Sequence, residues 1–354
     1  MSSEIIESVS VTPIPSNYRK ELGKNAYIDN IGTQRLEWVV RARSSSGAEG
    51  ISIANRMMRE GSVESMLAYI KGALLGREVD QLLEISDGVV TGAGPGMDHW
   101  YRHNGWMTIL AFDLVGKVRG VSAIDLLGGK KHDSVPAYDT TLYFQDFLNP
   151  VRGALQVGDE AAQAVADGWR AIKIKLGRGG RWMLPEDGMR RDIEVVVGAR
   201  EAVGPDVKIY VDANFGYDGH LDLLDQLIKE VTPADIFWFE EMITHNVDGY
   251  QPDIVGHGYL GWMDLERQLE GTGVRTIPHN FGNGSFGSYA SIVWGAASES
   301  YVSLEDERVI PHYLTVLPEF KNGAYALPTG PGLGTDIDEA GYAPHAKHEN
   351  RMEA

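Results

Sequence analysis

The run Ala171-Ile-Lys-Ile-Lys-Leu176 sets the pattern that decides the fold of this chain. It reads as a short β-strand, and both lysines face one way because side chains two residues apart on a strand point to the same side. Four later apolar runs also end in a polar residue, at Asp212, Glu240, His279 and Glu305. Amphipathic helical stretches separate the runs, and strands that alternate with helices predict a parallel sheet. With this many repeats, we expect the sheet to close into a barrel.

The sequence before this pattern predicts a different kind of structure. Glu4 to Val11 and Leu36 to Arg43 alternate apolar and polar residues, as half-buried antiparallel strands do. Between them, Pro13 to Asn30 predicts an irregular flap. The apolar spacing then becomes helical over residues 63–83 and 106–127. These features indicate a small α+β unit.

The length of the chain allows both units. With 354 residues, of which 43% are hydrophobic, it can form a large α/β barrel and a smaller companion domain. We place the α+β domain at residues 1–130, with a return of the chain near 320–354, and the barrel domain at 131–319.

Charge and residue types exclude several classes of protein. A formal net charge of −18 opposes binding to nucleic acid. No run approaches the roughly 18 uninterrupted apolar residues of a membrane-spanning helix. Cysteine is absent, which excludes a thiolate metal site and a catalytic thiol and fits a cytoplasmic location. Any metal must therefore be held by oxygen or imidazole.

Asp212 and Glu240 are candidate metal ligands. They stand 28 positions apart, close to one strand–helix unit, so they could project from neighbouring strands towards one point. Two carboxylates suit Mg²⁺, which also keeps waters or substrate oxygens as ligands. The alternative is that each merely caps the helix that follows its strand.

Lys173 and Lys175 are candidates for acid–base chemistry. Like charge and partial burial both depress the pKa of a lysine, and a lysine tuned in this way can act as a base near neutral pH. The alternative is a solvated basic edge or a salt bridge to acidic neighbours. The flanking apolar residues favour the interior of a barrel.

His279 and Glu305 follow at similar intervals. Asp253 precedes His279 by 26 positions and could orient the imidazole and raise its basicity. A protonated Glu305 could donate a hydrogen bond to a developing enediolate oxygen, or it could belong to a solvated acidic turn. Each of these residues could also be structural.

Six motifs in order resemble those of the mandelate racemase subgroup of the enolase superfamily: Lys-x-Lys, Val-Asp-Ala-Asn, Phe-Glu-Glu, Gln-Pro-Asp-Ile, Pro-His-Asn-Phe and Ser-Leu-Glu-Asp. Ala111 to Lys117, with Leu126 to Lys130, resembles the join between that family's capping domain and its barrel. The resemblance implies a modified TIM barrel of the (β/α)7β type with an α+β capping domain. It also implies assembly into a homo-oligomer, a dimer or an octamer.

The resemblance assigns a role to each candidate. Lys175 would be the base on one face of the substrate's α-carbon, and Lys173 would lower the pKa of Lys175 and contact the substrate carboxylate. His279 would act from the other face, oriented by Asp253. Asp212 and Glu240 would bind Mg²⁺, and Glu305 would donate to the enediolate. Thr140 would contact the substrate, and Asn214 would support the metal site. Two loops of the capping domain, Pro15 to Lys20 and Ile51 to Arg56, would select the substrate, and Tyr18 and Arg19 of the first loop would contact it.

These roles imply abstraction of the α-proton of a carboxylate, with Mg²⁺ neutralising the dianionic intermediate. Because the resemblance combines Lys-x-Lys with a His–Asp pair, we favour dehydration of an acid sugar to a 2-keto-3-deoxy acid. A racemase or epimerase of a 2-hydroxy acid is the second hypothesis. A carboxylate-binding barrel without catalytic power is the third.

One interval in the pattern is too short. The steps from Lys175 through Asp212, Glu240, Asp253, His279 and Glu305 are 37, 28, 13, 26 and 26 residues. Parallel neighbours need a crossover of about a dozen residues or more besides the strand. We therefore expect about one barrel unit, roughly 38 residues with a third metal ligand, to be missing between Asn246 and Val247. Either the sequence omits these residues, which we favour, or the protein is a true deletion variant.

Overall fold

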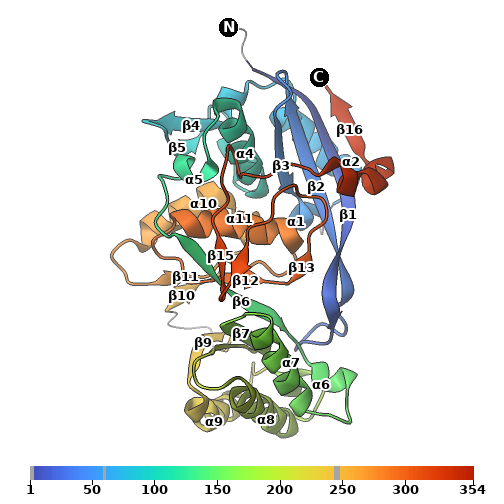
Figure 1. Cartoon of the computed structure of the whole chain (residues 1–354), viewed down its shortest axis with the longest axis vertical. Coiled ribbons are helices and arrows are strands. Elements are labelled where there is room, and N and C mark those ends of the chain that lie inside the picture. Colours follow the sequence, from blue (N-terminus) through green and yellow to red (C-terminus); the bar gives the residue numbers. More distant parts are fainter. Residues whose placement is uncertain (1–3, 59–60, 243–247) are drawn as a thin grey trace.

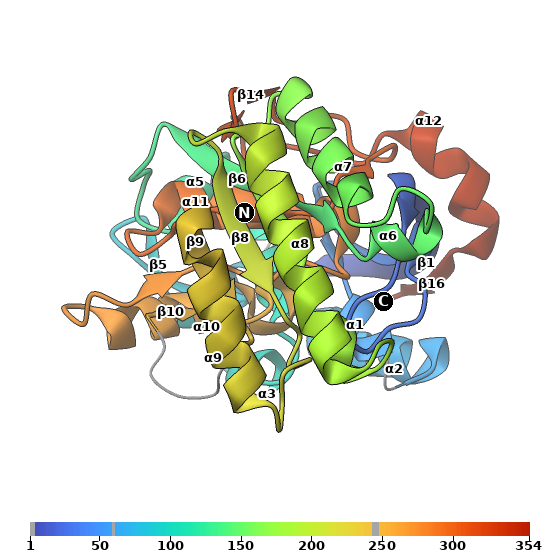
Figure 2. The same ribbon diagram turned by 90° about the horizontal axis from the view of Figure 1, so that it is seen from below.

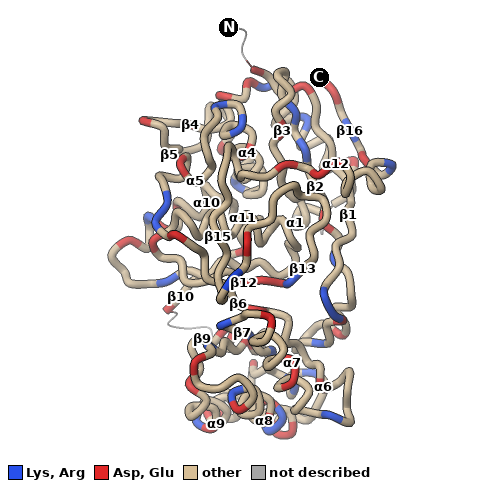
Figure 3. The backbone as a smooth tube through the Cα atoms, viewed as in Figure 1, with Lys and Arg blue, Asp and Glu red and all other residues tan. Residues whose placement is uncertain are grey.

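The structure is a computed structural model that describes residues 4–58, 61–242 and 248–354. Both described ends of the chain lie at the same end of the elongated molecule (Figure 1). Lys and Arg residues are interspersed with Asp and Glu residues in both the upper and the lower part of the molecule (Figure 3). Among the described residues, no helix combines the length and apolar character needed to cross a membrane.

An antiparallel sheet and its helices form the upper part of the molecule in Figure 1. The strands are β1 (Ile6–Leu22), β2 (Gly32–Ser44), β3 (Glu49–Ile53), β13 (Val309–Ile310) and β16 (Asn350–Glu353), with a separate hairpin of β4 (Leu83–Ser86) and β5 (Val89–Ala93). The helices are α1 (Asn55–Met58), α2 (Val63–Leu74), η1 (Val79–Gln81), α3 (Asp98–Tyr101), α4 (Trp106–Arg119) and α5 (Ala123–Leu126). The order β13-β1-β2-β3, with β16 also on β1, brings the end of the chain back to its beginning.

Most of the remaining elements form the parallel strands, two further strands that pair antiparallel at their edge, and the helices that cover them. The strands are β6 (Ser134–Leu142), β7 (Ala171–Lys175), β8 (Lys208–Asp212), β9 (Ile236–Glu240), β10 (Gly249–Tyr250), β11 (Arg275–Thr276), β12 (Leu304–Asp306), β14 (Phe320–Lys321) and β15 (Ala324–Ala326). The helices are α6 (Gln145–Leu148), α7 (Leu155–Ala166), η2 (Arg178–Gly180), α8 (Pro185–Val203), α9 (Leu221–Val231), η3 (Thr232–Ala234), α10 (Ile254–Leu269) and α11 (Gly284–Ala297). Two last helices, α12 (Glu339–Tyr342) and η4 (Ala343–His348), lie beside β1 and β16 of the antiparallel sheet (Figure 1). Seen from below, α7, α8 and α9 lie across one face of the lower strands (Figure 2).

The strands form an arc in the order β9-β8-β7-β6-β12, and every pair in it is parallel. A bridge between Thr276 and Tyr301 links β11 to the segment that precedes β12, and β10 pairs with β11. The predicted strands at β6, β7, β8 and β9 are therefore confirmed, and so is their alternation with helices.

The arc does not close into a barrel among the described residues, because β9 pairs with β8 on one side and with no described strand on the other. Side chains approach each other across the opening. Gln251 Nε2 donates to Glu240 Oε2 at 3.1 Å, and a Cβ added at Gly249 would lie 1.8 Å from the Trp238 ring, so only glycine fits there. The junction Asn246–Val247, where we expect a missing unit, lies outside the described residues.

The predicted flap is wrong over its first half. Strand β1 continues through Pro13 and Pro15 to Leu22, with Pro13 opposite Trp38 on β2. Proline lacks an N–H, which excludes it from strands with partners on both sides. On its other edge β1 pairs with β16 only at Ser8 to Val11 and with β13 only at Asn17 and Tyr18. The prolines lie between these two stretches, where no hydrogen bond is lost.

Candidate active site

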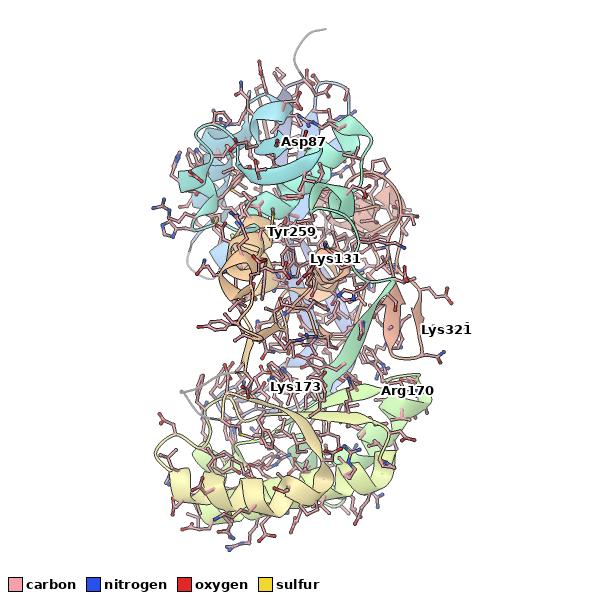
Figure 4. The ribbon with its side chains drawn as sticks, turned by 90° about the vertical axis from the view of Figure 1, so that its left-hand side faces the viewer. Asp87, Lys131, Arg170, Lys173, Tyr259 and Lys321 are labelled. Atoms are coloured by element: carbon pink, nitrogen blue, oxygen red, sulfur yellow. The ribbon has the colours of Figure 1, made fainter. Side chains whose placement is uncertain are left out.

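The two lysines of β7 point into the arc and are buried with their charges. Lys173 Nζ lies 3.0 Å from Glu240 Oε2, 2.5 Å from Glu305 Oε1 and 3.4 Å from Asp212 Oδ2. Lys175 Nζ donates to the same oxygen of Asp212, so this carboxylate lies between the two lysines. Figure 4 places Lys173 above the layer of α8 and α9, where the lower strands meet the rest of the molecule.

The expected depression of the lysine pKa is wrong for Lys173. Burial alone would lower the pKa of this ammonium group, but Glu240 and Glu305 lie against it and raise the pKa well above its usual value. The neighbouring strands supply more negative charge than Lys175 supplies positive charge. In this arrangement Lys173 is a fixed cation.

Asp212 and Glu240 converge as the sequence predicted. They occupy paired positions on β8 and β9, and both side chains are buried against Lys173. Burial and the charge of Asp212 raise the pKa of Glu240 to about 7. Two buried carboxylates side by side favour a cation between them, and here the Lys173 ammonium group fills that role.

Asp212 and Glu240 are carboxylates, which are side chains of the type that binds Mg²⁺. Among the residues that the structure describes, no group of three or more His, Cys, Asp or Glu side chains is arranged to hold a metal ion. However, Mg²⁺ often uses one or two protein carboxylates together with water and substrate oxygens. Asn214 Oδ1 is buried without a hydrogen-bond partner two residues after Asp212, and a nearby cation would satisfy it. Asn214 adopts a positive φ of 44°, and its amide group donates to Glu241 Oε2 at 2.8 Å.

The structure brings His279 and Asp253 together. Asp253 caps the N-terminus of α10 by accepting from Gly256 N at 2.6 Å, and its other oxygen lies 3.2 Å from His279 Nδ1. Burial lowers the pKa of His279, but the charges of Glu305 and Asp253 and the hydrogen bond to Asp253 outweigh this effect and raise it to about 9. The imidazole is therefore protonated at neutral pH and can act as a general acid.

Replacing Asp253 by asparagine should lower the pKa of His279 by about 1 to 2 units, because the ring loses a neighbouring negative charge. Asparagine is also a good N-cap, so α10 should keep its first turn. The measurement is an NMR titration of the histidine ring signals, with His279→Asn identifying the resonance. An unchanged titration in Asp253→Asn would show that this carboxylate does not hold the proton on His279.

Glu305 is a buried acceptor, which corrects its expected role as a protonated donor. Its Oε1 accepts from Lys173 and from Thr140 Oγ1 at 3.0 Å, and its Oε2 accepts from Asn280 N at 2.8 Å. Burial would raise the pKa of this carboxyl, but the nearby cations, Lys173 first, lower it well below its usual range. Thr140 therefore lies at the centre of the site through its contact with Glu305.

The two loop residues are separated. Tyr18 is buried and donates from its hydroxyl to Glu307 Oε2 at 2.8 Å, whereas Arg19 is exposed. Neighbouring residues of a strand point to opposite sides, and Arg19 lines a hollow with Asp167 and Arg308 to which Tyr18 does not contribute. The structure does not bring Arg19 to the lysines.

Sequence reasoning missed several residues of the site. Glu307 is buried beside the His279 loop, and Arg35 of β2 stacks over the Phe281 ring at 4.7 Å. Arg178 is buried between Asp146 and Asp192 just after β7. The spacing of Glu305 and Glu307 was a usable signal, because residues two apart at a strand end face the same side.

Comparison with known proteins places this geometry in a family. The model of the family described as Enolase C-terminal domain-like matches residues 156–251 and 242–341, which together cover more than half of the chain. The chain belongs to this family. The resemblance to the enolase superfamily is therefore confirmed, and the two matched segments meet at residues 242–251, across the opening between β9 and β10.

Curated relatives include several enzymes of the superfamily. The chain is 34% identical to arabinonate dehydratase of Saccharolobus solfataricus, with 64% of this chain and 67% of that protein aligned. It is 28% identical to D-galactarolactone cycloisomerase of Agrobacterium fabrum, covering 65% of this chain and 70% of that protein. Among solved structures, galacturonate dehydratase of a Geobacillus species superposes with a TM-score of 0.83 at 24% identity over 99% of both chains. This superposition supports the shared fold.

Proposed function

We propose that this enolase-family chain removes the α-proton of an acid-sugar carboxylate and then expels the β-hydroxyl, giving a 2-keto-3-deoxy acid. The observation that carries the proposal is the convergence of two acid–base groups on one site. Lys175 comes from the end of β7 and His279 from the segment after β11, and strands β6 and β12 lie between them. The two groups can therefore act on different sides of a bound substrate.

The raised pKa of His279 fits the last step of dehydration, because a protonated imidazole can give a proton to a departing hydroxyl group. In an epimerase the same group would give its proton to the α-carbon, so the names of the relatives, most of them dehydratases, favour dehydration. Lys175 would take the α-proton, and Lys173 would lie against the substrate carboxylate. Asp212 and Glu240 would hold Mg²⁺, which stabilises developing negative charge on the carboxylate oxygens when it is bound.

The relatives support this reaction class but not one substrate. Their names include dehydratases of arabinonate, D-gluconate and D-xylonate. A racemase of N-succinyl-Arg/Lys and the cycloisomerase support the second hypothesis, a racemase or epimerase that uses the same residues. The third hypothesis is a carboxylate-binding barrel impaired by the lack of a third acidic ligand.

A library of acid sugars incubated with Mg²⁺ in D₂O tests all three. Dehydration gives a 2-keto-3-deoxy product that NMR identifies. An acid sugar that gains deuterium at its α-carbon but does not lose water supports the epimerase instead. If no acid sugar reacts or exchanges, the dehydratase proposal is wrong and the binding barrel is favoured.

We also propose that the natural protein contains a strand–helix unit that this sequence lacks between β9 and β10. Three observations support this proposal: one edge of β9 pairs with no strand among the described residues, the family match falls in two segments, and Phe237 and Phe239 are 45% and 41% exposed. A strand buried on both faces is the rule in such barrels.

Protein from the native source should therefore exceed the 38.9 kDa of this chain by the mass of such a unit. The tryptic peptide from Glu230 to Arg267, which spans the junction, should be absent from its digest. Detecting that peptide intact would instead establish a true deletion.

A further inference from the structure

Three buried carboxylates fix the loop that follows His279. The amide N–H groups of seven consecutive residues, 280–286, donate to Glu305, then Glu307, then Glu37. Glu305 and Glu307 lie at the end of β12, but Glu37 comes from β2 in the antiparallel sheet. Successive amides that converge on anions form a strong electrostatic cradle. The position of this loop therefore depends on both sheets.

Glu307 divides its two oxygens between the loop and the hairpin of β1 and β2. Its Oε1 accepts from the amides of Gly282, Asn283 and Gly284 at 2.7, 3.1 and 3.0 Å. Its Oε2 accepts from the Tyr18 hydroxyl at 2.8 Å and lies 3.4 Å from Arg35 Nη2. The side chain of Glu307 is 0% exposed, so water does not replace these partners.

The hairpin also contacts the aromatic groups beside Lys175. In Figure 1 the hairpin of β1 and β2 runs down the side of the molecule towards the parallel strands. Arg35 lies over the Phe281 ring, and this ring and that of Tyr143 are 5.5 Å apart. Lys175 Nζ lies 5.4 Å from the Tyr143 ring and 6.0 Å from the Phe281 ring. The hairpin, the His279 loop and Lys175 thus form one contact network.

We propose that Glu307 is a positioning residue that couples the β1–β2 hairpin to the loop carrying His279, so that the acid–base groups are in place only when the hairpin is seated. Loss of a hydrogen bond to a buried carboxylate costs free energy, because no water replaces the lost partner. When the hairpin no longer donates to Glu307, we therefore expect the hydrogen bonds between Glu307 and the loop amides to weaken. The loop has little freedom to adapt. Gly284 has a φ of +66°, and a Cβ there would lie 2.4 Å from the Glu37 carboxyl.

Hydrogen exchange tests the coupling without any substrate. Tyr18→Phe removes only the hydroxyl from the hairpin side of Glu307, and amides 280–286 should then exchange about tenfold faster because one hydrogen bond to the shared carboxylate is lost. Glu307→Gln should have the same effect. The control is Glu49→Gln, which removes a carboxylate that pairs with Arg41 in the same sheet and should leave these amides unchanged. Unchanged exchange of amides 280–286 in Tyr18→Phe would overturn the proposal.

Kinetics give a second test, which rests on the proposed function. Tyr18→Phe and Glu307→Gln should each lower kcat about tenfold with little change in KM, and the double variant should be no slower than the slower single variant. Multiplied effects, or a rise in KM alone, would show that Tyr18 acts on the substrate independently of Glu307. If Glu307→Gln does not fold, Arg35→Gln takes its place on the hairpin side. If the wild type dehydrates no acid sugar, the exchange result still decides the coupling.

Discussion

Replacing Lys175 by alanine should lower kcat for α-proton removal by about 10³-fold, since a positioned general base contributes about 10²- to 10⁴-fold. Lys175 is 4% exposed and ends β7, with Asp212 and two aromatic rings around its ammonium group. Water cannot easily substitute for a base in such a position. Exchange of the substrate α-proton with D₂O, followed by NMR, measures this step directly.

Lys208→Ala is the matched control for this experiment. Lys208 begins β8, is exposed and stacks over the Phe237 ring at 4.3 Å, at the end of the sheet away from the site. Its removal should leave the exchange rate within twofold of the wild type. Exchange at the wild-type rate in Lys175→Ala, in a protein with an unchanged melting temperature, would transfer the role of base to another residue.

The chemistry at the strand ends could be predicted from the sequence because each feature is local. A polar residue that ends an apolar run marks the carboxyl end of a strand, and parallel strands bring these ends together. Asp212 with Glu240, and Asp253 with His279, meet for this reason. The interval of 13 residues before Asp253 follows β9, which pairs with no second strand among the described residues, and the missing unit itself stays a prediction.

The properties that depend on distant segments could not be predicted in this way. The pKa of Lys173 is set by carboxylates on β9 and β12, and no local pattern reveals how many will surround it. Tyr18 and Glu307 are 289 residues apart, so their hydrogen bond was invisible in the sequence. The composition of Pro13 to Asn30 suggested a flap, but the pairing of β1 with three other strands decided its structure.

Replacing Asp212 by asparagine, or Glu240 by glutamine, should weaken Mg²⁺ binding by at least about 100-fold. Loss of a residue that only orients a metal ligand costs up to about 100-fold in affinity, and loss of a ligand itself should cost at least as much. Each change keeps the shape of the side chain but removes one of the two charges that a divalent cation needs. Calorimetry with MgCl₂ and the substrate-free protein measures the effect without relying on turnover, and dehydration should fall in parallel.

Asp206→Asn provides the control for charge alone, because Asp206 is exposed just before β8, at the end opposite to Asp212. Mg²⁺ affinity that is unchanged in Asp212→Asn and Glu240→Gln would place the metal elsewhere. A wild type that binds no Mg²⁺ would mean that two carboxylates and Asn214 are not enough, which favours the binding-barrel hypothesis. Measurable wild-type affinity that both variants lose would show that β8 and β9 hold the cation, although β9 has only one partner strand in the described part of the chain.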